Sequence, residues 1–144
     1  METMRRMLFG VLLSGMAGIA AELLLTSHTE DAWQWTPLVL IFVGFPMVLL
    51  LFLRPAPGLV LATRALMALF IAAGALGTWF HYQSNAEFVA ELSPGLSGFA
   101  FFSEAFTRPT PPPLAPGAMI MLGLIGFICC YRPRRADALH THGE

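Results

Sequence analysis

Three side chains in this sequence have types and positions that could support chemistry: Glu22, His28 and His81. Glu22 lies within a long apolar run. If this run is a helix, Glu22 is about 6 Å along the helix axis from Thr26, at a rise of roughly 1.5 Å per residue. An ionisable group inside such a run is costly to bury and is a functional-site hypothesis by default. It could relay protons, accept a hydrogen bond or bind a cation. Burial also favours the neutral form of this carboxyl group. The alternative is therefore that Glu22 only stabilises helix packing, either as a neutral group or by extending to the nearby end of the apolar run.

His28 and His81 each follow the end of an apolar run. Imidazole and carboxylate groups together suit transition-metal ions, and two histidines from different helices can also hold haem or a chlorophyll-type pigment. We therefore name His28 and His81 as candidate cofactor ligands, and both of them with Glu22 as candidate metal ligands. Neither histidine has a metal-motif spacing, so interfacial histidines bonded to water and loop carbonyls are the alternative. Haem, pigment and metal all stay open, and the sequence requires none of them.

Other reactive residue types give no catalytic pattern. The chain has no phosphate-binding glycine loop, nucleophile elbow or zinc-protease motif. The adjacent Cys129 and Cys130 imply no disulfide framework, and most of the methionines are scattered through apolar runs as flexible packing residues. A net charge of -1 does not indicate a nucleic-acid partner. We expect a protein that is not an enzyme.

The composition indicates a chain that lies in a lipid bilayer. Hydrophobic residues make up 56% and charged residues only 12% of its 144 residues, whereas charged residues are about a quarter of a typical soluble domain. About twenty apolar residues are needed to cross a bilayer as a helix, and four runs approach that length: 7–25, 37–53, 59–80 and 114–131. None alternates apolar with polar residues as a barrel strand would. The sequence therefore predicts an all-α, single-domain bundle of four transmembrane helices over residues 1–144.

The positions of the arginines predict how this bundle is oriented. Lysine is absent, and seven of the eight arginines lie at one side of the predicted spans: Arg5, Arg6, Arg54, Arg64, Arg132, Arg134 and Arg135. Positive residues are retained on the cytoplasmic side, so both termini, including the tail 132–144, are expected there. Trp33, Trp35, Trp79 and Tyr82 then form an aromatic belt on the outer side. The first run also resembles a signal peptide, and we expect it to be retained as an anchor.

The outer loop 82–113 should contain short interfacial helices. Ser84 with Glu87 forms a capping box that predicts one helix through about Leu92, where Pro94 follows. A second helix is predicted over 96–106, because large apolar residues recur there at helical spacing. Its phenylalanines suit the membrane interface or a protein partner, and we name as partner contacts Phe99, Phe102 and Phe106.

Stripes of small residues predict which faces of the helices approach one another, since membrane helices associate through such residues. Three stripes lead to a polar residue: Gly10, Ser14 and Gly18 to Glu22; Gly74 and Gly77 to His81; Gly123 and Gly126 to Cys130. We expect each stripe to face a helix, either of the same chain or of another subunit.

The overall plan resembles small four-span membrane proteins of bacteria, which implies the cell inner membrane. The segments 21–31 and 114–117 look like family hallmarks, but they match no characterised family and assign no functional residue. We expect an accessory or structural subunit of a larger integral membrane complex, respiratory, photosynthetic or transport, that contributes helix packing and an outer-face cap. Its partners would be the lipid bilayer and other membrane subunits or a second copy. Two alternatives stay open: a cofactor-binding redox protein that uses His28 and His81, and a small proton-coupled transporter that uses Glu22.

Overall fold

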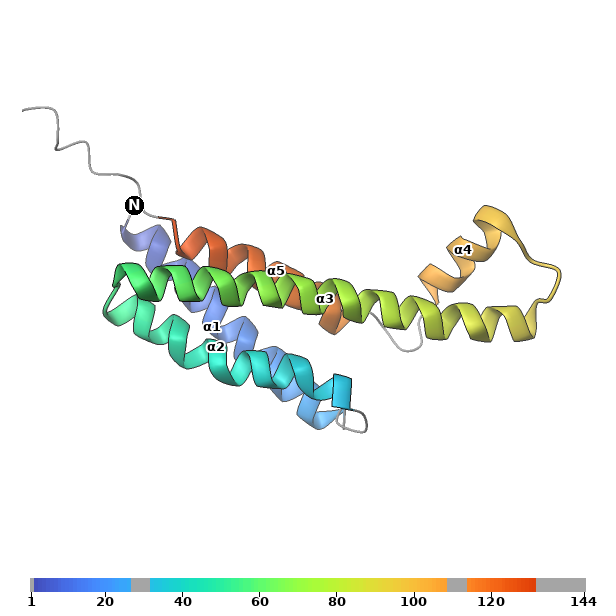
Figure 1. Ribbon diagram of the computed structural model, residues 1–144, viewed down its shortest axis with the longest axis horizontal. Helices are drawn as coiled ribbons and strands as arrows, with labels where there is room; N and C mark the ends of the chain where they lie inside the picture. Colours follow the sequence, from blue (N-terminus) through green and yellow to red (C-terminus); the bar gives the residue numbers. More distant parts are fainter. Residues whose placement is uncertain (1, 27–31, 109–113, 132–144) are drawn as a thin grey trace, which may run out of the picture.

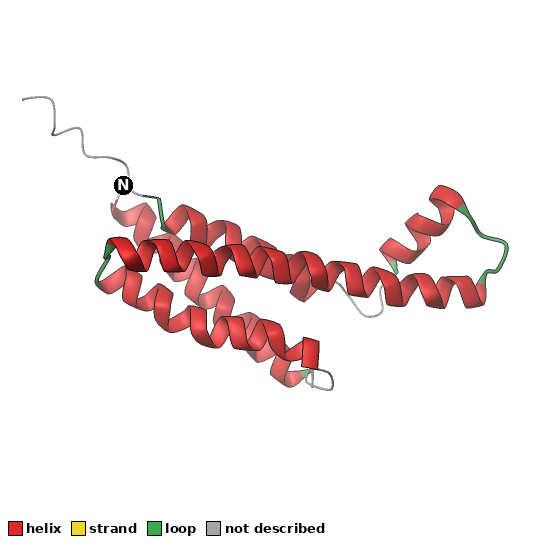
Figure 2. Ribbon diagram, viewed as in Figure 1, coloured by secondary structure: helices red, strands yellow, loops and turns green. Residues whose placement is uncertain are grey.

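The computed structural model describes residues 2–26, 32–108 and 114–131 of the chain, which form helices and no strand (Figure 2). The elements are listed here in chain order: α1 (Glu2–Leu25), the single-turn helix η1 (Ala32–Gln34), α2 (Trp35–Leu53), α3 (Pro57–Leu92), α4 (Gly98–Thr107) and α5 (Leu114–Cys129). His28 and the tail 132–144 lie outside the described residues. The all-helical prediction is confirmed for the described part of the chain.

Three helices, α1, α2 with the turn before it, and α3, are long and apolar enough to cross a membrane. This fits a membrane protein. The fourth apolar helix, α5, has 16 residues and is about 24 Å long at the helical rise of roughly 1.5 Å per residue, which is shorter than a hydrocarbon core of about 30 Å.

The bundle is a ring of four helices in which α1 packs on α2 and α5, and α3 packs on α2 and α5 (Figure 1). Its centre is filled by large apolar side chains from all four helices, among them Leu12, Met16, Val48, Phe70 and Leu122. The start of α1, the turn between α2 and α3, and the end of α5 all lie at one end of the bundle. We call this the proximal end and the opposite end, toward α4, the distal end.

The predicted reversal between the second and third apolar runs is present between Leu53 and Pro57. Pro57 occupies the first turn of α3, where a residue without an N–H group leaves no hydrogen bond unmade. The backbone N–H of Arg54 donates to the carbonyl of Leu50 and closes α2. The tight turn makes α2 and α3 antiparallel neighbours.

Glycines bring α3 and α5 into close contact, as two of the three stripes predict. A Cβ atom at Gly74 would lie 2.5 Å from the carbonyl oxygen of Pro116, and one at Gly123 would lie 2.8 Å from the carbonyl oxygen of Met67. Gly126 lies against the Met67 side chain. These backbones therefore approach more closely than helices with ordinary side chains could.

The third stripe, on α1, does not face another helix among the described residues. No atom of another described element lies within 4 Å of a Cβ position at Gly10 or Gly18, and Glu22 is exposed. The helix turns its larger residues inward instead, through Phe9, Leu12, Met16 and Leu23. Lipid solvates large and small apolar side chains alike. The inward face of each helix is therefore the one whose side chains fill the centre of the bundle.

The prediction of a separate helix beginning at Ser84 is wrong, because α3 runs without a break to Leu92. No proline or glycine interrupts residues 78–93, so the i to i-4 hydrogen bonds continue and Ser84 has no free helix end to cap. The predicted second helix is present as α4, which begins two residues later than expected and packs back on the distal part of α3 (Figure 1).

Candidate functional site

A cavity of about 450 Å³ lies at the distal end of the bundle, where α1, η1, α2, α3 and α5 meet. We call it the distal cavity. Its lining residues are Leu23, Trp33, Gln34, Thr36, Pro37, Ala73, Leu76, Gly77, Phe80, His81, Ser84, Ala115, Pro116 and Met119. This volume is within the range of small-molecule sites in proteins.

The polar residues of the distal cavity lie on the elements that form its distal rim. Along α3, Ala73 and Gly77 are followed by His81 and Ser84, at spacings that keep all four on one side of the helix. Gln34 ends η1 and Thr36 lies in the first turn of α2, so both belong to the same rim. The deeper wall contains the buried Leu23 and Met119.

The structure places one of the three predicted chemical residues, His81, in this cavity. Glu22 is not among the lining residues and is exposed on α1. His28 is outside the described residues. Within residues 2–26, 32–108 and 114–131, no group of three or more histidine, cysteine or acidic side chains could hold a metal ion.

Sequence reasoning did not identify Gln34, Thr36 and Ser84 as residues of one site with His81. The sequence pattern could have identified one of these residues. Gly77, His81 and Ser84 are spaced i, i+4 and i+7, which places them on one face of a helix. Gln34 and Thr36 come from the start of another helix, and their approach to α3 depends on how the bundle packs.

A second hollow, an open groove of about 620 Å³, runs along the side of the bundle between α1 and α2. We call it the lateral groove. Ala17 and Ala20 of α1 line it together with larger α2 side chains, including Trp35, Phe42 and Phe45. Phe42 is 81% exposed, so this apolar side of the bundle has no covering element among the described residues.

The α3–α4 hairpin, residues 81–107, is held by a small buried contact at its centre. Asn85 and Val89 of α3 and Ala105 of α4 are almost fully buried. The small side chain of Ala105 allows the two helices to approach. This hairpin lies beyond the ring of four helices (Figure 1).

A row of aromatic rings runs from the bundle onto the hairpin. The ring centroids of Trp79 and Tyr82 are 5.8 Å apart, those of Tyr82 and Phe102 5.5 Å, and those of Phe102 and Phe106 5.7 Å. Phe99 is 6.4 Å from Phe102 and is 82% exposed. The three phenylalanines that the sequence marked as partner contacts thus form one exposed surface, which we call the phenylalanine face.

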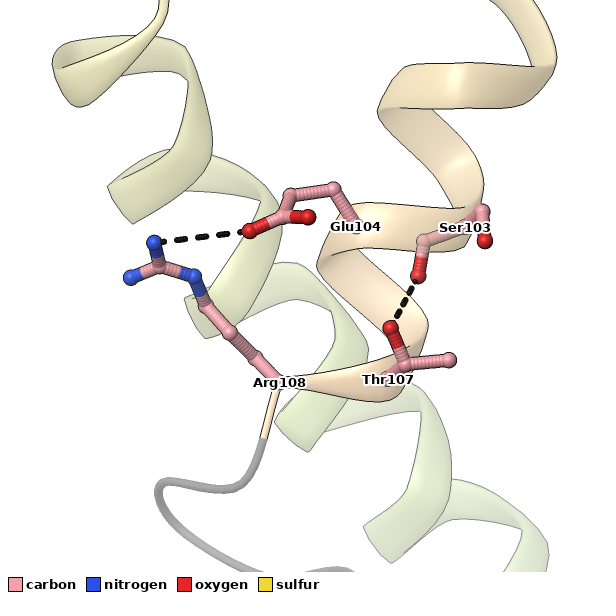
Figure 3. Close-up of polar contacts among 4 residues, drawn as sticks. All are labelled: Ser103, Glu104, Thr107 and Arg108. Carbon is pink, nitrogen blue, oxygen red and sulfur yellow. Dashed lines mark hydrogen bonds and ion pairs between the residues drawn. The ribbon is translucent and has the colours of Figure 1, made fainter.

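Arg108, which follows the end of α4, contacts both helices of the hairpin. Its guanidinium carbon lies 4.5 Å from the centroid of the Phe88 ring, a cation–π distance. Its Nη2 atom is 3.6 Å from Oε1 of Glu104, one helical turn earlier, as Figure 3 shows. In the same figure the hydroxyl of Thr107 donates to the carbonyl of Ser103 at 2.7 Å. The end of α4 is therefore tied both to itself and to α3.

Basic residues also make the contacts at the proximal end. Arg64 of α3 donates from Nη2 to the carbonyl of Cys130 at 3.1 Å, which satisfies a carbonyl at the end of α5. Arg5 lies over the ring of Phe9, with its guanidinium carbon 5.4 Å from the ring centroid. The neighbouring Cys129 and Cys130 are reduced and buried.

Comparison with known proteins found no match: no family model, no curated protein and no solved structure resembles the chain.

Proposed function

We propose that this protein is an accessory subunit of a larger integral membrane complex and that it binds a partner through the phenylalanine face of the α3–α4 hairpin. The observation that carries the proposal is the hairpin itself. It extends beyond the ring of helices (Figure 1) and presents Phe99, Phe102 and Phe106 to its surroundings. Contiguous exposed apolar surface of this kind marks sites of protein or membrane interaction.

The features at the two ends of the bundle support the following proposed placement in the bilayer. Four helices cross the cell inner membrane, with α5 as the fourth span and both termini cytoplasmic. Arg5, Arg6, Arg54 and Arg64 all belong to proximal segments, as the positive-inside rule requires. The rings of Trp33 and Phe80 are in tilted contact at the distal end with centroids 5.9 Å apart, as part of an aromatic belt.

The length of α3 supports a hairpin that stands outside the bilayer. Its 36 residues span about 54 Å at a rise of roughly 1.5 Å per residue, far more than a hydrocarbon core of about 30 Å. With Trp79 and Tyr82 at the outer interface, the ten residues 83–92 project about 15 Å into water. The phenylalanine face begins at this interface, where the Phe102 ring centroid lies 5.5 Å from that of Tyr82. Its exposed rings are best covered by a second protein, since aromatic residues are enriched at protein interfaces.

The surface of α1 supports the same function within the bilayer. Gly10, Ser14 and Gly18 are exposed on α1, and the lateral groove lies beside them between α1 and α2. Small residues allow a further helix to approach closely in lipid. Glu22, at the distal end of this surface, would then lie against the partner helix rather than lipid.

The test is extraction of the affinity-tagged chain in a mild detergent, followed by sizing and identification of stoichiometric partners. We expect a species larger than the monomer in which the same polypeptides recur. The double variant Phe99→Ala, Phe102→Ala should release them, while Phe127→Ala, which removes an exposed ring from α5, should not. Recovery of the wild-type chain as a free monomer, or equal retention of partners by both variants, would exclude the proposal.

A further inference from the structure

The distal cavity is long in the direction of the bundle axis and changes in polarity along it. Ala73 and Ser84 both line it and are eleven residues apart on α3, which corresponds to roughly 16 Å along the helix. Toward the bundle the wall includes the apolar side chains of Ala73 and Met119. At the distal end it carries an imidazole, an amide and two hydroxyl groups, from His81, Gln34, Thr36 and Ser84.

No Asp, Glu, Lys or Arg side chain is among the described residues that line this cavity. A head group with a full charge would find no Asp, Glu, Lys or Arg counter-charge among these described lining residues, and placing an unpaired ion against apolar walls is strongly unfavourable. Imidazole, amide and hydroxyl groups each offer more than one hydrogen-bonding position. They suit a neutral head group that carries oxygen atoms.

Small residues keep the inner part of the cavity open. Ala73 and Gly77 on α3 lie opposite Ala115 and Pro116 on α5. A Cβ atom at Gly77 would lie 3.1 Å from Cγ of Pro116, so α3 and α5 are in contact at this part of the wall. A single hydrocarbon chain can lie against apolar walls of this kind.

We propose that the distal cavity binds an uncharged amphiphile, with an oxygen-bearing head group at His81, Gln34 and Ser84 and a single hydrocarbon tail directed past Ala73 toward the bundle centre. The head group carries carbonyl or hydroxyl oxygens, as in a quinone or a long-chain alcohol. The site is separate from the phenylalanine face and does not depend on a protein partner.

The experiment uses fluorescence of Trp33, which lines the cavity. The variant Trp35→Phe, Trp79→Phe leaves Trp33 as the only one of the three tryptophans. It is reconstituted in phosphatidylcholine nanodiscs and titrated with three quenching probes. These are decylubiquinone, a long-chain alcohol with bromine next to its head group, and the corresponding bromo fatty acid, which is ionised. We expect saturable quenching by the quinone, the alcohol or both, and at least tenfold weaker quenching by the acid.

Substitutions in this single-tryptophan protein separate a site from random contact with lipid. Ala73→Leu fills the deep end of the cavity, and its matched control is Ala72→Leu, because Ala72 is the adjacent exposed residue. We expect Ala73→Leu to weaken quenching by the neutral probes at least tenfold and Ala72→Leu to leave it within twofold. His81→Leu should weaken it about threefold to tenfold, the value of one hydrogen bond.

Circular dichroism shows whether Ala73→Leu folds. If it does not, Ala115→Leu replaces it in the test, because it fills the same space from α5. Equal quenching in the filled and control variants would mean that Trp33 meets the probes in bulk lipid only, and would overturn the proposal. Quenching by the ionised acid as strong as by the alcohol would also overturn it.

Discussion

The contact between α3 and α5 predicts different effects for the same substitution at different glycines. A Cβ atom at Gly74 would lie 2.5 Å from the carbonyl oxygen of Pro116 and 3.0 Å from the backbone nitrogen of Ile120. Ordinary contacts of this kind are 3.4–4 Å long. Since both neighbours are backbone atoms, Gly74→Ala must push the helices apart by about an ångström. At Gly18 a Cβ atom meets nothing within 4 Å.

The expected effect is the difference in the free energy of unfolding between Gly74→Ala and Gly18→Ala. In a helix interior, Gly→Ala gains about 0.5–1 kcal/mol of helix stability at either position, so this contribution cancels in the comparison. Overpacking a tight contact costs about 1–3 kcal/mol. We therefore expect Gly74→Ala to be less stable than Gly18→Ala by about 1–3 kcal/mol, with Gly18→Ala as stable as the parent protein or slightly more so.

The assay is reversible unfolding of the monomer in mixed micelles by titration with sodium dodecyl sulfate, followed by far-ultraviolet circular dichroism. Gly123→Ala tests the same contact from α5, since its Cβ atom would lie 2.8 Å from the carbonyl oxygen of Met67. Gly10→Ala repeats the open control. Equal stabilities for Gly74→Ala and Gly18→Ala would refute close packing of α3 on α5.

Three further predictions concern the two ends of the bundle. Arg64→Ala removes the hydrogen bond to the end of α5 and should lower the free energy of unfolding in micelles by about 1.5–3 kcal/mol, as for a charged donor. Arg54→Ala, in the turn between α2 and α3, should change it little. Arg108→Ala removes the cation–π contact with α3, worth about 0.5–2 kcal/mol. It should speed hydrogen exchange in α4 by up to about thirtyfold and leave exchange in α5 unchanged. In intact spheroplasts an impermeant maleimide should label Ser97→Cys and not Gly58→Cys. The opposite labelling pattern would invert the proposed orientation.

Local patterns predicted several elements of the fold correctly. The apolar runs predicted helices, among them α2, which ends at Leu53 as expected, and the greater part of α3. The spacing of phenylalanines predicted α4. These features depend on residues within a few positions of each other, so one stretch of sequence contains all the relevant information. The capping box at Ser84 failed because a cap acts only where a helix begins, and the chain upstream is already helical.

The candidate site was less accessible to such reasoning. His81 was identified from its position after an apolar run, but its neighbours in the distal cavity come from other elements: Gln34 from η1, Thr36 from α2 and Ala115 from α5. Glu22, the most conspicuous ionisable residue in the sequence, lies on the exposed side of α1 and is not a neighbour of His81 in the cavity. Residue type and position along the apolar runs predicted that Glu22 and His81 share a site. The described residues do not form such a site.

The sequence by itself determined that the described part of the chain is helical and where most of these helices begin and end, because composition and backbone hydrogen bonding act along the chain. It predicted four spans, and three of the helices are long and apolar enough to cross a membrane. Only the tertiary structure decided which side of each helix faces inward. In lipid, large and small apolar residues are equally well solvated, so burial follows from shape. Gly74 and Gly123 are covered while Gly10 and Gly18 are not, and this choice opens the distal cavity beside His81 and leaves Glu22 outside it.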